Sequence, residues 1–337
     1  MPSSTFSSEP RRVPCGRWSA IWLVAIVLAI GATTLLERAV RSRNHRPSID
    51  GDDVVTWSLT RRDTGHARNV VAFVGTSRLA LAISPRAFHE AAPSLRPVQL
   101  SINGVYAMGV LGDLADDPTF RGVAVVDIIE WDVDVLDAFA GAKPYVERSH
   151  ALWRAPGALA NRYLANIFQS KLAVLAVTGR GFLTLFGGRM PERRWVTTNL
   201  DRWMEGDYST ARPAELARKA AQRESGFASI PTPEGFLNRL ATDLEPLVAK
   251  IRAHGGDVVV IRMPVSGRLD GWFTRHFPRA RYWDAFAART RAHTIYMPDV
   301  LGPLPLPDEM HVDVTQQAAF THALVDAMRA RGILDGR

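Results

Sequence analysis

A long uncharged run near the N-terminus is the clearest feature of the hydrophobic pattern. Nineteen residues from Trp18 to Leu36 carry no charge, and Arg17 and Glu37 bound them. At ~1.5 Å of rise per residue, a helix of this length crosses a ~30 Å hydrocarbon layer, so the run predicts one membrane-spanning helix over residues 18–36. A signal peptide and a buried core helix are the alternatives, but no clear A-x-A cleavage site follows GATT, which favours the anchor. Arginines flank both ends, so the positive-inside rule does not choose an orientation.

Beyond this run the pattern becomes polar and then breaks into short apolar segments. Residues 1–17 are predicted to form a tail, and the polar stretch around RPSIDGDD makes residues 37–67 a predicted linker. A folded domain is expected over residues 68–335. Its apolar segments are rich in Val and Ile, which is typical of strands covered on both faces. The predicted strands are Asn69–Val74, Pro97–Ile102, Gly122–Ile129, Asp257–Arg262 and Thr294–Met297.

Helical patterns lie between and after these strands. They cover Pro85–Ala92, Tyr145 to about Leu185, Pro213–Glu224, Pro233–His254, Trp283–His293 and Thr315–Gly332. Alternation of strands and helices indicates a parallel sheet, because parallel neighbours need a crossover connection. The predicted fold class is therefore α/β, a parallel sheet between helices in a three-layer, flavodoxin-like sandwich.

A long section at about residues 130–232 does not follow this alternation. It contains an apolar tract from Ala165 to Gly188 that Lys171 and Arg180 interrupt. We expect a helical insertion or cap packed on the sheet domain, and a surface that dips into the membrane beside the anchor is the alternative. A second spanning helix is disfavoured, because both cations would lie within it.

Composition excludes several classes of protein and site. The chain has 337 residues, of which 47% are hydrophobic, enough for one large core. Its net charge is +7, but the basic residues are scattered among 34 acidic ones, so no nucleic-acid partner is expected. Cys15 is the only cysteine, which excludes an internal disulfide and a Cys-rich metal site. The histidines show no H-x-x-x-H spacing, and no metal or other cofactor is expected.

The segment VVAFVGTSRLALAI places Ser77 at a turn between a predicted strand and a predicted helix. Ligands collect at the carboxyl ends of parallel strands, where the next helix presents free N–H groups. A serine at such a turn is more often a helix cap than a nucleophile. The G-x-S-x-G elbow is not matched, because Leu79 occupies the position of its second glycine.

A second candidate lies near the end of the chain. Asp308 and His311 stand three residues apart in a Pro-rich loop just before the last predicted helix. A general base needs one imidazole nitrogen free and the other held by an acceptor, and a carboxylate within the same turn can hold it. With Ser77, these residues would complete a Ser-His-Asp triad if the last helix brings the loop to the end of the first strand.

These segments together resemble a known family. GTS at residues 75–77, Gly104 in SINGV and the D-x-x-H of residues 308–311 resemble the first, second and fifth blocks of the SGNH (GDSL-type) hydrolase superfamily. One membrane helix followed by VGTSR, a late strand VVVIRMPVS and the D-x-x-H loop is similar to membrane-anchored members related to alginate O-acetylation and DltD-like proteins. The resemblance covers residues 69–328 with a large unmatched middle.

The resemblance implies roles for individual residues. Ser77 matches the nucleophile, His311 the general base and Asp308 the residue that orients the base. The backbone N–H groups of Ser77 and Gly104 match two donors of the oxyanion hole. Thr76 replaces the Asp of the GDS form, a change that the anchored relatives tolerate.

The third block departs from the family pattern. It should read G-x-N-D after the third strand, but VVDIIEWD contains no Asn. Asp127, Glu130 and Asp132 cannot donate as an amide does unless they are protonated, so the third oxyanion donor is unassigned. Asn103 could compensate, and a plain turn residue is the alternative.

Two arginines are candidates for binding an anionic substrate. Arg78 follows Ser77, and Arg262 ends the late strand, where it could line the rim of a pocket. For Arg78, a position on the helix surface is the alternative.

The resulting hypothesis is a membrane-anchored SGNH-type serine esterase or O-acyltransferase. The anchored relatives imply an acyl-ester substrate, a cell-envelope or exported glycan as acceptor, and a partner membrane acyltransferase. They also imply an inner-membrane location with the domain on the periplasmic side. The alternative is a non-catalytic envelope scaffold or glycan-binding protein that keeps the fold. A nucleotide-binding domain is disfavoured, because no further glycine or lysine stands near Gly75.

Overall fold

The computed structural model describes residues 15–65, 67–131, 140–152, 154–176, 195–226 and 230–335. The chain divides into two compact units. The first comprises Met1–Arg46 and Leu172–Arg193, and the second comprises Pro47–Lys171 and Arg194–Arg337. The first unit contains the long apolar helix, and the second contains the sheet.

The first unit is built on α1 (Cys15–Arg41). Its segment Arg17–Arg41 has 25 residues and a mean hydropathy of 2.3, which is long and apolar enough to cross a membrane. A membrane anchor and a signal sequence both have this length and composition. The short helix α8 (Ala173–Ala176) belongs to the same unit. Its first two N–H groups donate to the Glu37 carboxylate at 2.9 Å, and it packs on Val40.

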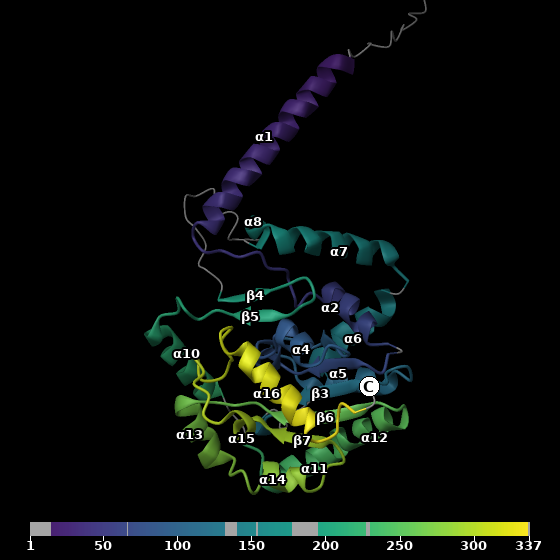
Figure 1. Ribbon diagram of the computed structural model, residues 1–337, viewed down its shortest axis with the longest axis vertical. Helices are drawn as coiled ribbons and strands as arrows, with labels where there is room; N and C mark the ends of the chain where they lie inside the picture. Colours follow the sequence, from purple (N-terminus) through teal and green to yellow (C-terminus); the bar gives the residue numbers. More distant parts are fainter. Residues whose placement is uncertain are drawn as a thin grey trace, which may run out of the picture. The chain divides into compact units, whose positions relative to one another are not determined.

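The second unit is organised around a five-stranded sheet in the order β2-β1-β3-β6-β7 (Figure 1). Every neighbouring pair in it is parallel. The strands are β1 (Val70–Val74), β2 (Arg96–Gln99), β3 (Val123–Asp127), β6 (Asp257–Arg262) and β7 (His293–Tyr296). All five strands predicted from the sequence are present, and the prediction of a parallel α/β sheet is confirmed.

Alternate residues of each central strand face two separate cores. In β1, Val70, Ala72 and Val74 belong to one apolar cluster, while Val71 and Phe73 belong to another. β3 and β6 divide in the same way, because side chains alternate across a strand. Both faces of the sheet are therefore covered, which explains why these strands read as continuous Val-rich runs.

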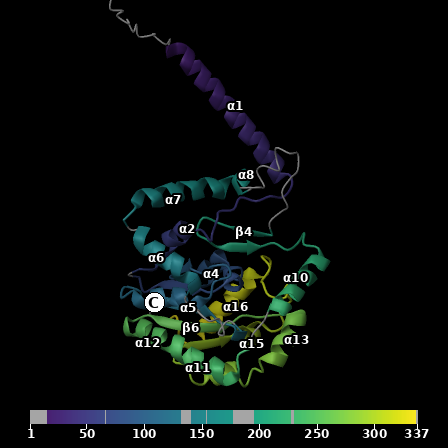
Figure 2. The same ribbon diagram turned by 180° about the vertical axis from the view of Figure 1, so that it is seen from behind.

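Helices form the two outer layers. One face of the sheet is covered by α2 (Val54–Arg61), α5 (Ala107–Asp116), α6 (Lys143–Leu152), α11 (Pro233–Asp243), α12 (Glu245–Ala253), α13 (Gly267–His276) and α14 (Trp283–Ala287). The other is covered by α3 (Ser77–Ala80), α4 (Pro85–Ala91), α15 (Met297–Leu301) and α16 (Gln317–Arg329). Figure 1 shows α16 in front of the sheet, and Figure 2 shows α5, α11 and α12 on the opposite side. The sheet and its two helical layers form a three-layer sandwich.

Some elements differ from those expected. The predicted linker, residues 37–67, contains α2, whose Trp57 is fully buried and donates its indole N–H to Leu100 O at 3.1 Å. No helix was expected at α5, which contains two glycines, Gly109 and Gly112, that lower helix propensity. Two short strands were also not expected, β4 (Val196–Thr198) and β5 (Met204–Gly206), which pair antiparallel.

The section expected as a helical insertion holds these two strands together with α6, α7 (Pro156–Lys171) and α10 (Pro213–Gly226). The predicted helix from Tyr145 corresponds to α6, α7 and α8, and its last part, from residue 177, lies outside the described residues. The predicted helix Pro233–His254 is two helices, α11 and α12, which meet at Leu244.

Candidate active site

The carboxyl ends of β1 and β3 lie side by side where the order of the sheet reverses. From β1 the chain crosses to β2 on one side and then returns to β3 on the other. In open parallel sheets, ligands bind outside the strand ends at this switch point. Ser77 follows β1 directly there, after the turn of Gly75 and Thr76.

The turn is shaped so that Ser77 is not the helix cap. Thr76 is the N-cap of α3, and its hydroxyl accepts the Arg78 N–H at 3.4 Å. The expectation that Ser77 itself would cap the helix therefore does not apply, and its hydroxyl has another partner. Gly75 is required by space, because a Cβ there would lie 2.9 Å from the Cβ of Asp127 at the end of β3.

The loop before α16 is closed by the carboxylate of Asp308. Its Oδ1 accepts the backbone N–H of His311 at 2.9 Å and that of Met310 at 3.3 Å. Glu309 adopts a left-handed conformation, φ +67°, and fixes the loop to α13. Its Oε2 accepts the Leu269 N–H at 3.0 Å, and its carbonyl accepts the Ser266 N–H at 3.0 Å. The D-x-x-H segment is thus a rigid turn rather than a free loop.

This turn meets the Ser77 corner in the geometry of a triad. Ser77 Oγ lies 2.9 Å from His311 Nε2, and His311 Nδ1 lies 2.8 Å from Asp308 Oδ2. The carboxylate accepts from Nδ1–H, so Nε2 is the nitrogen free to accept the serine proton. Ser77 is half-buried, while His311 is 8% exposed and Asp308 is 2% exposed. The structure therefore brings together all three residues that the sequence singled out.

Arg223 and Tyr208 also contact Asp308, and the sequence did not single them out. Arg223, on α10, donates to Asp308 Oδ2 at 2.8 Å and to Asp308 O at 2.7 Å, and its Nη2 lies 3.4 Å from His311 Nδ1. The Tyr208 hydroxyl lies 3.4 Å from Asp308 Oδ2. No local pattern marks either residue, since both come from the insertion and reach Asp308 only through the fold.

The electrostatics of the site keep Asp308 ionised. Burial by itself raises the pKa of the Asp308 carboxyl, but the hydrogen bonds and charges of His311 and Arg223 outweigh it and hold that pKa well below its usual range. Burial, followed by the charge of Asp308, raises the pKa of the Tyr208 phenol above its usual value. Tyr208 therefore remains a neutral donor beside a carboxylate.

Gly104 and Asn103, the oxyanion-hole candidates other than Ser77, lie on the loop that follows β2. The Ile102 N–H donates to Gly75 O at 3.0 Å, so the chain after β2 runs beside the Ser77 turn. Gly104 follows with φ +69°, a conformation that favours glycine. The backbone N–H of Asn103 donates to Asp52 Oδ1 at 3.2 Å, and its side chain is exposed.

The two arginines expected at the substrate are buried and paired. Arg78 Nη2 lies 3.1 Å from Asp127 Oδ2, and Arg262 Nε lies 3.0 Å from Glu130 Oε2. Both side chains are 4% exposed, so the alternative that Arg78 lies on a helix surface is wrong. Desolvation of the fully buried Asp127 raises the pKa of its carboxyl, against the opposing charges of Arg78 and Arg262. Asp127 and Glu130, at and just after the end of β3, are thus both paired with arginines, and Asp132 lies outside the described residues.

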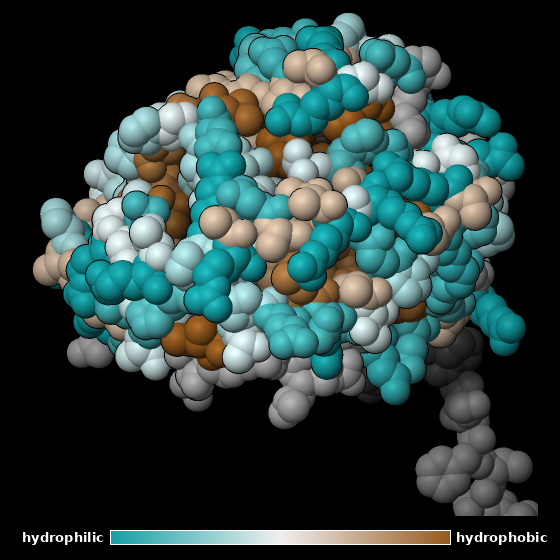
Figure 3. All heavy atoms as spheres, turned by 90° about the horizontal axis from the view of Figure 1, so that it is seen from below, coloured by the Kyte–Doolittle hydropathy of each residue, from teal (hydrophilic) through white to brown (hydrophobic). Residues whose placement is uncertain are grey.

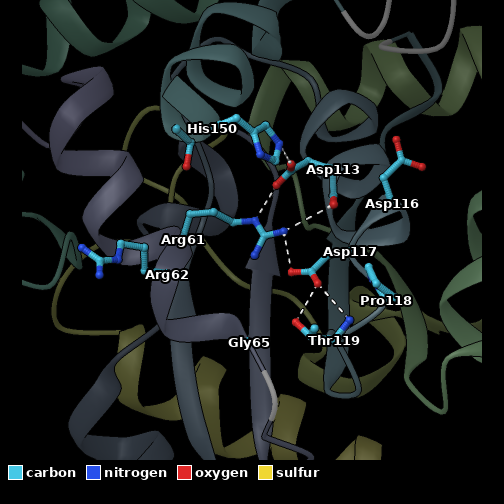
Figure 4. A pocket seen from close by; sticks show the side chains of 10 residues that line it. Arg61, Arg62, Gly65, Asp113, Asp116, Asp117, Pro118, Thr119 and His150 are labelled. Carbon is cyan, nitrogen blue, oxygen red and sulfur yellow. Dashed lines mark hydrogen bonds and ion pairs between the residues drawn. The ribbon is translucent and has the colours of Figure 1, made fainter. Parts of the chain in front are cut away.

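A second polar cluster lines a cavity of about 370 Å³ at the opposite end of the sheet (Figure 4). Arg61 pairs with Asp113 and with Asp117, the latter at 3.1 Å, and the His150 Nε2 lies 3.0 Å from Asp113 Oδ1. The Thr119 hydroxyl in this cavity donates to Asp117 at 2.6 Å. Among the described residues, no group of three or more His, Cys, Asp or Glu side chains could hold a metal ion.

Comparisons with known proteins yield a similar solved structure but no family. No protein-family model matches the sequence, and no curated protein matches it. Among solved structures, the chain is similar to the crystal structure of TesA, with 12% sequence identity and a TM-score of 0.36 over 77% of this chain and 98% of that chain. A superposition of this quality assigns neither a family nor an activity.

Proposed function

We propose that the protein is an SGNH-type serine esterase or O-acyltransferase that works through an acyl-enzyme on Ser77. The observation that carries the proposal is the continuous pair of contacts from Ser77 Oγ to His311 Nε2, 2.9 Å, and from His311 Nδ1 to Asp308 Oδ2, 2.8 Å. The retained order of the family-like blocks along the chain supports it.

In this mechanism Ser77 Oγ attacks the carbonyl carbon of an acyl ester, while His311 Nε2 accepts the hydroxyl proton. The imidazolium that forms is stabilised by the Asp308 carboxylate. Collapse of the tetrahedral intermediate breaks the ester C–O bond, and His311 returns the proton to the departing alcohol. Water or a sugar hydroxyl then attacks the acyl-serine with His311 again as base, which regenerates Ser77 and releases an acid or a new ester.

The negative charge of the intermediate would be bound by backbone N–H groups. Those of Ser77 and Gly104 are the proposed donors, and loss of one oxyanion donor typically costs ~3 kcal/mol in the transition state. Neither β3 nor the described residues 128–131 after it contain an Asn or Gln side chain, and Asp127 and Glu130 pair with arginines. We assign Arg78 and Arg262 to these pairs rather than to the substrate.

The setting follows from the resemblance and from α1. We assign α1 to an inner-membrane anchor with the sheet-containing unit on the periplasmic side, a cell-envelope or exported glycan as acceptor, and a partner membrane acyltransferase as the source of the acyl group. A secreted enzyme whose α1 is cleaved as a signal sequence would do the same chemistry, and the length of the mature chain distinguishes the two.

The test is labelling of the detergent-solubilised full chain with a fluorophosphonate probe. Wild type is expected to label, and Ser77→Ala and His311→Ala to lose labelling. His150→Ala is the matched control, because His150 also pairs with a buried aspartate but lies at the other end of the sheet, and it is expected to label fully. A folded wild type that labels neither with this probe nor with a small sulfonyl fluoride would contradict the proposal and support the scaffold alternative.

A further inference from the structure

The outward face of α7 is apolar, although α7 is a surface helix of the sheet-containing unit. Its inner side is fixed to that unit by polar contacts: Asn166 Nδ2 donates to Thr56 Oγ1 at 3.1 Å, and Arg162 pairs with Asp53 at 2.7 Å. Its outer side carries Tyr163, Leu164 and Phe168, which are 49%, 56% and 59% exposed. The same inner side buries Leu159, so α7 has one side packed on the unit and a second apolar side that is open.

This exposure is concentrated at one place. In the described part of the sheet-containing unit, four large hydrophobic side chains are exposed, and three of them are on α7, the fourth being Ile230. Figure 3 shows the far face of the unit, over α11 and α14, where hydrophilic residues predominate and apolar ones are scattered. Scattered apolar residues need no explanation, whereas a cluster on one helix marks a contact surface.

The spacing suits a helix that lies in a lipid interface. Leu164 and Phe168 are four residues apart and therefore share one face, where Ala160 and Gly157 are also exposed. Tyr163 stands at the border of this face, and Lys171 ends the helix. Interfacial helices show this pattern: apolar side chains on one face, with an aromatic hydroxyl and a lysine at its margin.

The path of the chain indicates that lipid covers this face. In the first unit, the Glu37 carboxylate binds the N–H groups of Ala173 and Val174. Glu37 directly follows the apolar run that ends at Leu36, so this contact lies where α1 would leave the hydrocarbon layer. Lys171 is two residues from Ala173, at most ~7 Å of chain. Because the chain is continuous, the C-terminal end of α7 must therefore lie close to the membrane surface.

We propose that the α7 outer face, defined as Tyr163, Leu164 and Phe168, is a membrane-contact surface that inserts among lipid headgroups and the tops of the acyl chains. This attachment to lipid would limit rotation of the sheet-containing unit about the points where the chain joins it to the first unit, after residues 46, 171 and 193. The proposal rests on α1 lying in the membrane and is independent of the chemistry at Ser77.

The experiment places a polarity-sensitive fluorophore on single cysteines in a Cys15→Ser background of the full chain. Reporter positions are Leu164→Cys and Phe168→Cys, Val24→Cys in α1 is the lipid reference, and the exposed Glu234→Cys on α11 is the aqueous control. The protein is reconstituted in phosphatidylcholine vesicles with and without doxyl-labelled lipid. We expect quenching by doxyl lipid at 24, 164 and 168 and none at 234, with iodide giving the opposite order.

Three outcomes would overturn the proposal. If 164 and 168 respond to iodide as strongly as 234 does, the face is in water. If they are protected from iodide but not quenched by doxyl lipid, a protein covers the face, either a second copy or another subunit. Failure of quenching at 24 removes the anchor on which the proposal depends, and so also contradicts it.

A matched pair of chains distinguishes membrane contact made by the α7 outer face from proximity to the membrane that α1 alone would cause. A reporter at the exposed Ala160→Cys is compared in the otherwise native chain and with Leu164→Glu and Phe168→Glu added. These positions are exposed, so circular dichroism should be unchanged. Quenching at 160 is expected to be lost in the double variant while quenching at 24 persists. Equal quenching at 160 in both chains would show that the apolar face is not what holds α7 at the lipid.

Discussion

Two clusters of arginine, aspartate and histidine lie at opposite ends of the same sheet, and they differ in what the histidine can reach. At the carboxyl ends of the strands, Arg223 and His311 bind Asp308, and His311 Nε2 faces the Ser77 hydroxyl. At the other end, Arg61 and His150 bind Asp113. Both aspartate side chains are 3% exposed. A buried Asp-His pair is therefore not sufficient to define a catalytic site.

The histidines themselves make the difference. The His150 side chain is 69% exposed, whereas that of His311 is 11% exposed. The Thr119 hydroxyl lines the same cavity as His150, but it donates to Asp117. Water around His150 screens its pair with Asp113, so this cluster serves to join α2, α5 and α6. The His311 cluster is enclosed and stands at a strand-to-helix turn, where its base is held in one orientation.

The sharpest test of this comparison replaces each aspartate by asparagine. Asp308→Asn is expected to lower hydrolysis of p-nitrophenyl acetate by about 10⁴-fold, because the amide no longer holds His311 in the required tautomer. Asp113→Asn should leave the rate unchanged. It should lower the free energy of unfolding by about 2–3 kcal/mol, because Arg61 loses its main partner but keeps Asp117. Comparable rates for the two variants would remove the distinction between the clusters.

A smaller effect is expected from Arg223, which touches Asp308 but not the reacting atoms. Arg223→Ala should lower the rate about tenfold, since charge-assisted hydrogen bonds contribute roughly 1.5–3 kcal/mol and only part of this acts on catalysis. It should also move the acidic loss of activity to higher pH, because Arg223 helps to hold the pKa of the Asp308 carboxyl down. Arg223→Lys should restore part of the rate and part of the shift in the pH profile.

The pH profile separates this positioning role from a purely structural one. If Arg223→Ala reduces the amount of folded enzyme but leaves the rate per folded molecule and its pH profile unchanged, Arg223 only holds α10 in place.

The smallest expected effect is on stability in acid. The folded pKa of Asp308 is lowered, with burial opposed by His311 and Arg223, so the folded state binds fewer protons than the unfolded chain. This carboxylate stabilises the fold above about pH 4, and its contribution is lost as the pH falls through its lower folded value. The pKa of Asp117 is also lowered, by Thr119 and Arg61 against burial.

Thermal unfolding of wild type, Asp308→Asn and Asp117→Asn at pH 7 and pH 3 measures this. The difference in melting temperature between wild type and each variant should shrink at pH 3, more for Asp308, because the Asp117 side chain is 21% exposed. Differences that stay constant between the two pH values would contradict the assignment of lowered pKa values.

The sequence predicted those features of the fold and the site that depend on residues close together in the chain. Strands such as β1 and β6 are Val-rich because both faces are covered, and such runs are visible in any single sequence. Asp308 and His311 share one turn, so their contact is also local. By contrast, α5 was not predicted, because Gly109 and Gly112 within it lower its helix propensity and its burial depends on the surrounding helices.

The sequence by itself determined an apolar helix, a parallel α/β sheet and two short segments that carry Ser77 and the D-x-x-H turn. The tertiary structure alone decided that these segments meet, 234 residues apart, at the switch between β1 and β3. It also decided that Arg78 and Arg262 are buried with carboxylates and that Arg223 binds Asp308. Such choices depend on which groups the fold removes from water, because a buried charge must find a partner wherever in the chain that partner lies.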